Sequence, residues 1–183
     1  GKPGGLEYYE REINQALEAL GSHHTYMLGE SSGAAAALYY GVRCGAEKVL
    51  ALTMPYPMAS WATGWAWLGN LFNIRELIND WPSYKDALII SSFSVLAHKT
   101  LVRRIGSENI FDPIETFLTA DSRPKVTLVY GARCKGDATN VARVAEESEV
   151  TLVPIDSGRH TLWIPLARQR PIDSLIRETF FEG

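Results

Sequence analysis

Cysteine is scarce in this chain of 183 residues, which contains only Cys44 and Cys134. Two isolated thiols match no metal-ligand spacing and build no disulfide framework, so we expect buried, inert thiols and a cytoplasmic location. A large excess of one sign of charge is absent as well, with 18 basic and 21 acidic residues. A net charge of −3 gives no reason to expect nucleic acid or an anionic membrane as a partner. A hydrophobic share of 46% is that of an ordinary globular domain.

A stretch without charged residues runs from Val49 to Ile74. It lacks the continuity of a membrane-spanning helix, because prolines and glycines interrupt it at four positions. These are Pro55, Pro57, Gly64 and Gly69. The stretch therefore predicts a buried strand, a turn and an apolar helix, with no membrane span. The opening residues GKPGG contain no apolar segment, so we expect no signal peptide there.

Hydrophobic periodicity places the main elements. Short apolar runs predict buried strands at 24–29, 48–53, 125–130 and 150–154. Amphipathic, alanine-rich or proline-started segments predict helices at 6–20, 32–42, 138–147, 161–167 and 171–181. Strands that alternate with helices indicate an α/β fold, with a parallel sheet of about four strands flanked by helices.

A long segment separates the second strand from the third. It divides the chain into an α/β core, at 1–53 and 124–183, and an insert at 54–123. The insert holds four of the five tryptophans, and its pattern predicts helices at 59–72 and 84–105. We therefore expect a largely helical, aromatic insert on the α/β core.

The strongest motif joins the first strand to the second helix. Gly29, Glu30, Ser31, Ser32 and Gly33 form a G-x-S-x-G pattern between an apolar strand and an alanine-rich helix. A nucleophile elbow requires this strand-turn-helix setting, and the two glycines leave room for the sharp turn. The start of the helix points backbone N–H groups at the serine oxygen. Ser31 is therefore the predicted nucleophile, and Ser32 supplies a predicted oxyanion-hole N–H.

A serine hydroxyl needs a base and an orienting acid, and later loops offer both. Asp137 follows the third predicted strand in KVTLVYGARCKGD, and His160 follows the fourth in VTLVPIDSGRH. Parallel sheets place their active sites beyond the carboxyl ends of their strands, where all three residues fall. With this order of serine, acid and histidine, the sequence resembles the α/β-hydrolase superfamily. The resemblance implies a Ser31–Asp137–His160 triad that needs neither a metal nor an organic cofactor.

Other residues compete for these roles. Ser32 adjoins Ser31, but the spacing of the glycines favours Ser31. Asp156 lies closer to His160 along the chain, and we expect it to shape the turn there. Asp121 precedes a strand and so falls at the wrong end of the sheet.

The insert has a counterpart in the resembling family, whose members often carry a cap domain over the substrate pocket. The resemblance implies a hydrophobic pocket for a small acyl substrate. Trp61 and Trp65, one helical turn apart, and Trp163 from the histidine loop are candidates for its wall. Ordinary packing of an aromatic helix is the alternative for most of the tryptophans. Trp163 is the best candidate for substrate contact.

The sequence departs from the family before the nucleophile. In the full fold, further strands precede the nucleophile, and an HG-type loop next to them supplies a second oxyanion-hole donor. This sequence shows no such loop before Ser31. The strand at 24–29 is therefore expected at the edge of the sheet, covered by another domain, a subunit or a second copy. The less favoured alternative is that the chain's own insert hides this edge. The implied activity is that of an esterase or thioesterase. The alternatives are a non-catalytic binding or assembly domain, and an acyltransferase or deacylase that acts on a glycan.

Overall fold

The computed structural model describes residues 5–54, 69, 71–105 and 111–182. Four parallel strands form one sheet in the order β1-β2-β3-β4, which confirms the predicted fold class. The strands are β1 (Tyr26–Glu30), β2 (Lys48–Leu52), β3 (Lys125–Gly131) and β4 (Val150–Ile155). The helices are α1 (Gly5–Leu20), α2 (Ser32–Arg43), α4 (Ile74–Asn79), α5 (Trp81–Ile105), α6 (Pro113–Leu118), α7 (Lys135–Val144), α8 (Trp163–Gln169), α9 (Ile172–Arg177) and the π-helix η2 (Glu178–Glu182).

The carboxyl ends of the strands meet at one edge of the sheet. Glu30 pairs with Leu52, and Gly131 with Ile155, so the chain leaves all four strands on the same side. Order along the chain equals order across the sheet, and β1 and β4 are therefore the two outer strands. The loop that follows β4 must therefore cross the ends of the inner strands in order to reach the turn that follows β1.

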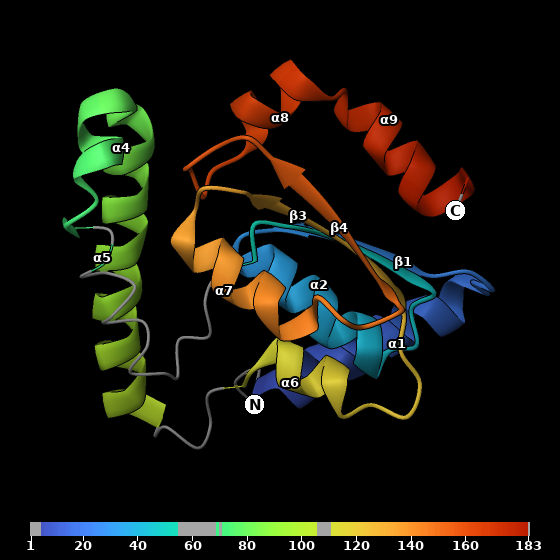
Figure 1. Cartoon of the computed structure of the whole chain (residues 1–183). Coiled ribbons are helices and arrows are strands. Elements are labelled where there is room, and N and C mark those ends of the chain that lie inside the picture. Colours follow the sequence, from blue (N-terminus) through green and yellow to red (C-terminus); the bar gives the residue numbers. More distant parts are fainter. Residues whose placement is uncertain (1–4, 55–68, 70, 106–110, 183) are drawn as a thin grey trace.

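Helices cover both faces of the sheet (Figure 1). On one face, α2, α6 and α7 pack against β2 and β3 around a core that includes Leu38, Phe117 and Val141. On the other face, α8, α9 and η2 cover a second core, with Leu50, Leu166 and Leu175 among its buried side chains. Burying two separate apolar faces of the sheet requires these two layers of helices.

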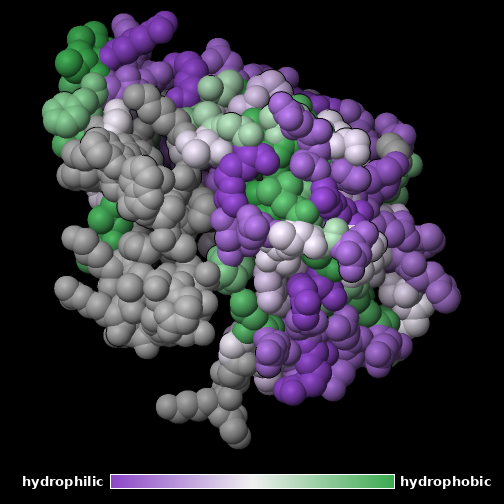
Figure 2. Space-filling model, turned by 60° about the horizontal axis from the view of Figure 1, so that its bottom comes forward, coloured by the Kyte–Doolittle hydropathy of each residue, from purple (hydrophilic) through white to green (hydrophobic). Residues whose placement is uncertain are grey.

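The helix α1 lies outside α2 and carries the predicted amphipathic pattern. The Tyr40 hydroxyl donates to the carbonyl of Leu6 over 3.3 Å, and Arg43 forms an ion pair with Glu10 at 3.1 Å. The contacts between α1 and α2 are thus partly polar, and no residue of α1 is fully buried. The described face that Figure 2 brings forward is mostly hydrophilic as well, with small hydrophobic patches.

The described part of the predicted insert is built around α4 and α5, which lie beside the carboxyl edge of the sheet in Figure 1. The predicted helix at 84–105 is the major part of α5, whereas most of the one at 59–72 lies outside the described residues. No described helix is long and apolar enough to cross a membrane. Both α4 and α5 expose large apolar side chains, namely Ile74, Leu77, Ile78, Trp81, Ile89, Phe93 and Leu96.

Another helix in the range of the predicted insert packs differently. In α6, Ile114 and Phe117 are each 1% exposed and belong to the core beneath the sheet. Asp112 caps this helix by accepting hydrogen bonds from the backbone N–H groups of Ile114 and Glu115. The sequence pattern did not predict α6, because six residues are too few to show a helical period.

The outer strand β1 is less buried than its neighbour. Leu28 is 50% exposed, whereas its partner Leu50 on β2 is 1% exposed. The strand begins at Tyr26, two residues after the predicted start, since its pairing with β2 starts with Tyr26 and Lys48; His24 is exposed, and its ring contacts Glu47.

Candidate active site

The turn that holds Ser31 is strained in the way a nucleophile elbow requires. Ser31 has φ 53° and ψ −122°, a positive-φ conformation that residues other than glycine seldom adopt. Its N–H donates to the carbonyl of Leu52 at 2.9 Å, which ties the turn to β2. This backbone lifts the serine to the carboxyl edge of the sheet, at the N-terminus of α2.

Of the two glycines in the motif, one has a steric reason to be glycine. A Cβ atom on Gly29 would lie 2.1 Å from the carbonyl oxygen of Gly33, so no other residue fits without a shift of the backbone. A Cβ atom on Gly33 would meet no described atom within 4 Å. The close approach of strand and helix therefore explains why residue 29 is a glycine. Gly33 takes part in that approach through its backbone carbonyl.

Asp137 lies in the first turn of α7, just beyond β3, and its side chain is 2% exposed. One carboxylate oxygen accepts a hydrogen bond from the N–H of Gly131 at 3.0 Å. The other lies 2.9 Å from Nδ1 of His160. The carboxylate is thus held by the end of β3 on one side and holds the histidine ring on the other.

His160 joins this carboxylate to the serine. Its Nε2 atom lies 3.0 Å from the Ser31 hydroxyl oxygen, and its side chain is 7% exposed. With Asp137 on Nδ1, the neutral ring carries its proton there, which leaves Nε2 to accept from the serine. The structure therefore brings together all three residues of the predicted triad.

The environment of His160 favours the charged imidazolium. Burial by itself lowers the pKa of this ring, but the hydrogen bond and charge of Asp137 outweigh burial, and Asp86 and Glu30 add to them. The pKa of His160 is therefore raised above its ordinary value of 6.5. Such a ring stabilises the proton that it would receive from a serine.

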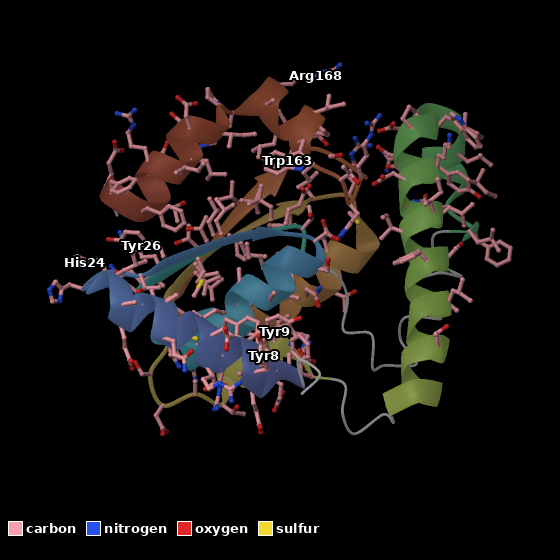
Figure 3. The ribbon with its side chains drawn as sticks, turned by 180° about the vertical axis from the view of Figure 1, so that it is seen from behind. Tyr8, Tyr9, His24, Tyr26, Trp163 and Arg168 are labelled. Carbon is pink, nitrogen blue, oxygen red and sulfur yellow. The ribbon has the colours of Figure 1, made fainter. Side chains whose placement is uncertain are left out.

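Trp163 lies at the start of α8 and is 40% exposed. Its indole N–H donates to the carboxylate of Glu30, the residue before Ser31. Figure 3 shows Trp163 above the sheet, whereas His24 and Tyr26 lie at the amino end of β1. The structure thus places Trp163 beside the elbow, and Trp61 and Trp65 lie outside the described residues.

The two competing carboxylates lie elsewhere. Asp156 is exposed and pairs with Arg133 at 2.9 Å, so it belongs to the surface of the loop. Asp121 is exposed at the amino end of β3. Cys134 is 5% exposed, and burial, with Asp137 nearby, raises the pKa of its thiol strongly. A thiol held protonated in this way is a poor nucleophile.

Solved structures provide a comparison for this arrangement, whereas no family model and no curated protein matches the chain. A variant of AqdC, which recognises the Pseudomonas quinolone signal and cleaves its ring, is 17% identical, with a TM-score of 0.59. The match covers 100% of this chain and 76% of AqdC.

Two further structures are similar to the chain over most of its length. The meta-cleavage product hydrolase CumD from Pseudomonas fluorescens IP01 is 13% identical, with a TM-score of 0.56, and the match covers 98% of this chain and 72% of CumD. The α/β hydrolase MGS-M2, from a Medee basin deep-sea metagenome library, is 15% identical, with a TM-score of 0.58 over 100% of this chain and 74% of that enzyme. This chain has the α/β-hydrolase fold.

In this α/β-hydrolase fold, one group of buried side chains also has the chemistry of metal ligands. Atoms of Cys134, Asp137 and His160 lie within 4.8 Å of one another. However, Asp137 and His160 are hydrogen-bonded to each other, and the Cys134 thiol beside them is held protonated. A metal ion would have to break that hydrogen bond and displace the thiol proton, so the arrangement fits a triad better than a metal centre.

Sequence reasoning missed one contact of the site. Asp86, on α5, accepts hydrogen bonds from the backbone N–H groups of His160 and Thr161, at 2.8 and 3.1 Å. His160 and Thr161 follow Asp86 by 74 and 75 residues along the chain. A single acidic residue near the start of an apolar helix forms no recognisable sequence pattern. Only the folded chain places Asp86 at the site.

Proposed function

We propose that this protein is a serine hydrolase that transfers the acyl group of a small ester or thioester to water. The observation that carries this proposal is the continuous hydrogen-bonded chain from Ser31 through His160 to Asp137. A serine hydroxyl becomes an effective nucleophile when an oriented base removes its proton, and this chain of contacts supplies both base and orientation.

The proposed reaction has two stages. Ser31 attacks the carbonyl carbon while His160 takes its proton, and the imidazolium then protonates the leaving alcohol or thiol. Water next attacks the acyl-serine, giving its proton to His160, which returns a proton to Ser31 as the acid departs. Asp137 holds the ring and stabilises its charged form throughout.

The negative charge that develops on the carbonyl oxygen needs donors. Ser32 is the first residue of α2, and the first N–H groups of a helix have no partner within the helix. The N–H of Ser32 is therefore the proposed oxyanion donor, supported by the positive end of the helix dipole. A second donor is proposed to come from the domain, subunit or second copy expected beside β1.

The fold alone does not select this reaction, because similar structures include both a hydrolase and the ring-cleaving AqdC. The elbow and the buried Ser–His–Asp contacts favour acyl transfer. Transfer of the acyl group to a glycan, or deacylation of a glycan, would use the same serine chemistry. A cytoplasmic location is likewise proposed from the scarcity of cysteine.

A fluorophosphonate probe tests the proposal directly, because it forms a covalent bond with an activated serine and releases fluoride. We expect a probe adduct on Ser31, located by peptide mass spectrometry, and no adduct in Ser31→Ala. Ser32→Ala is the matched control, since it removes the neighbouring hydroxyl and keeps the backbone N–H. Labelling that persists in Ser31→Ala, or that never occurs in the folded protein, would refute the serine mechanism.

The exposed outer strand favours a second candidate function, a binding or assembly module. Leu28 is half exposed on β1, and such an edge is a template for pairing with another strand. A partner there would come from another domain, a subunit or a second copy. Light scattering during size-exclusion chromatography tests this idea: a complex that Leu28→Lys dissociates supports it, and a concentration-independent monomer contradicts pairing between copies.

A further inference from the structure

A carboxylate on the insert holds the backbone of the histidine loop, the segment at 156–162. Asp86, near the start of α5, accepts three hydrogen bonds from two adjacent residues of that loop. One oxygen accepts from the N–H of His160 at 2.8 Å and from the N–H of Thr161 at 3.1 Å. The other oxygen accepts from the Thr161 hydroxyl at 3.1 Å.

The topology of the sheet explains why this loop needs an external support. β4 and β1 are the outer strands, so the loop after β4 must cross the ends of β3 and β2 before His160 reaches Ser31. Its first part is tied to the segment after β3, where the N–H of Arg133 donates to the carbonyl of Ser157 at 3.0 Å. Further along the loop, Asp86 accepts from the backbone N–H of His160 itself.

We propose that Asp86 is a positioning residue for His160, and that through it the insert sets the place of the base relative to Ser31. Asp137 fixes the ring at Nδ1, and Asp86 fixes the backbone that carries the ring. This inference rests on the proposed hydrolase function, since it concerns the base of that reaction. It makes α5 part of the support of the site, in addition to any role in covering a pocket.

The charge of Asp86 also acts on the ring. The titratable groups around His160 are Asp137 on α7, Glu30 at the end of β1, Cys134 before α7 and Asp86 on α5. Burial lowers the pKa of His160, Asp137 raises it, and Asp86 and Glu30 raise it further. Removing the charge of Asp86 should therefore lower the pKa of His160 even where the hydrogen bonds survive.

A second aspartate of the insert offers a matched control. Asp80, before α5, lies 3.5 Å from Arg133, and its carboxylate accepts from the hydroxyl of Ser83. Asp80 is not among the leading causes of the raised pKa of His160, whereas Asp86 is. Asp80→Asn thus removes the same charge from the same part of the insert without touching the backbone of His160.

Three variants of the full chain separate the effect of the position of His160 from the effect of the charge of Asp86. Asp86→Asn keeps an oxygen that can accept from both N–H groups, Asp86→Ala removes the acceptor, and Asp80→Asn is the control. We expect fluorophosphonate labelling of Ser31 to slow about 10- to 100-fold in Asp86→Ala, because small misplacements of a reacting group have effects of this size. Asp86→Asn should label nearly as fast as the wild-type protein at high pH, as should Asp80→Asn.

An NMR titration of the His160 ring provides a readout that does not depend on activity. We expect the pKa of His160 to fall in Asp86→Asn and to stay unchanged in Asp80→Asn. An unchanged pKa in Asp86→Asn together with wild-type labelling in Asp86→Ala would overturn the inference. If Asp86→Ala does not fold, Thr161→Val and Asp86→Asn still test the contact. If the wild-type protein is not labelled, the hydrolase proposal fails, and the titration alone decides the role of Asp86.

Discussion

Two loops meet at the candidate site, and they are held in different ways. The nucleophile elbow is built from the consecutive residues 29–33 and is tied to the adjacent strand β2. The histidine loop is held by partners that lie far away along the chain, namely Asp137, 23 residues before His160, and Asp86, 74 residues before it. The shape of the elbow is set mainly by residues 29–33 themselves, whereas the place of the histidine loop depends on tertiary contacts.

This difference has consequences for substitutions. A local turn stores its strain in its own backbone, so changes to the glycines of the elbow should affect mainly the stability of the protein. A loop held from outside can shift while the core stays folded, so changes in its supports should affect mainly the reaction of Ser31. Matched pairs of variants can separate these two outcomes.

The largest expected effect on labelling comes from changing Asp137, a support of the histidine loop. Asp137→Asn should slow fluorophosphonate labelling by about 10,000-fold, because the amide favours the wrong tautomer of His160. Asp156→Asn, on the same loop as His160, removes only an exposed ion pair and should label close to the wild-type rate. Equal losses in both variants, measured as second-order labelling rates, would mean that Asp137 has no special role.

The elbow should respond through stability. Gly29→Ala places a Cβ atom 2.1 Å from a backbone oxygen, and we expect the free energy of unfolding to fall by about 3 kcal/mol. Gly33→Ala meets open space within α2 and should be neutral or stabilising by up to about 1 kcal/mol. Urea denaturation measures both values. A similar loss in the two variants would show that the close approach at Gly29 is not the cause.

A smaller effect is expected beneath the histidine loop. A Cβ atom on Gly131 would lie 2.7 Å from the carbonyl oxygen of Arg159, the neighbour of His160. Gly131→Ala should therefore displace the loop and slow labelling about 10- to 100-fold. Gly136→Ala, where a Cβ atom would meet no described atom within 4 Å, is the control and should keep the wild-type rate. If both variants label normally, the loop tolerates the displacement.

The smallest effect is the pH dependence that His160 imposes. Since its pKa is raised, labelling should increase with pH through a midpoint above 6.5. The same shift stabilises the folded state fully below about pH 6.5, and this contribution is lost as pH rises through the folded pKa. A pH profile of labelling and urea unfolding at several pH values measure the two effects. A labelling midpoint below 6.5 would contradict the raised pKa.

Much of the fold could be predicted because its signals are local. The apolar runs of the strands and the strand-turn-helix context of Ser31 each lie within a few residues. The order of Ser31, Asp137 and His160 also follows from the chain, because each lies just beyond a strand. The helix α6 escaped prediction because it is short, and its place in the core depends on contacts with α2 and α7.

The sequence by itself determined the α/β alternation, the elbow and the candidates for nucleophile, acid and base. Only the tertiary structure decided that the loop after β4 crosses two inner strands, that Trp163 donates to Glu30, and that Asp86 holds His160. The physical reason is the range of the interactions. Backbone strain and hydrophobic period act over a few residues and leave a pattern, whereas a hydrogen bond between segments 74 residues apart leaves none.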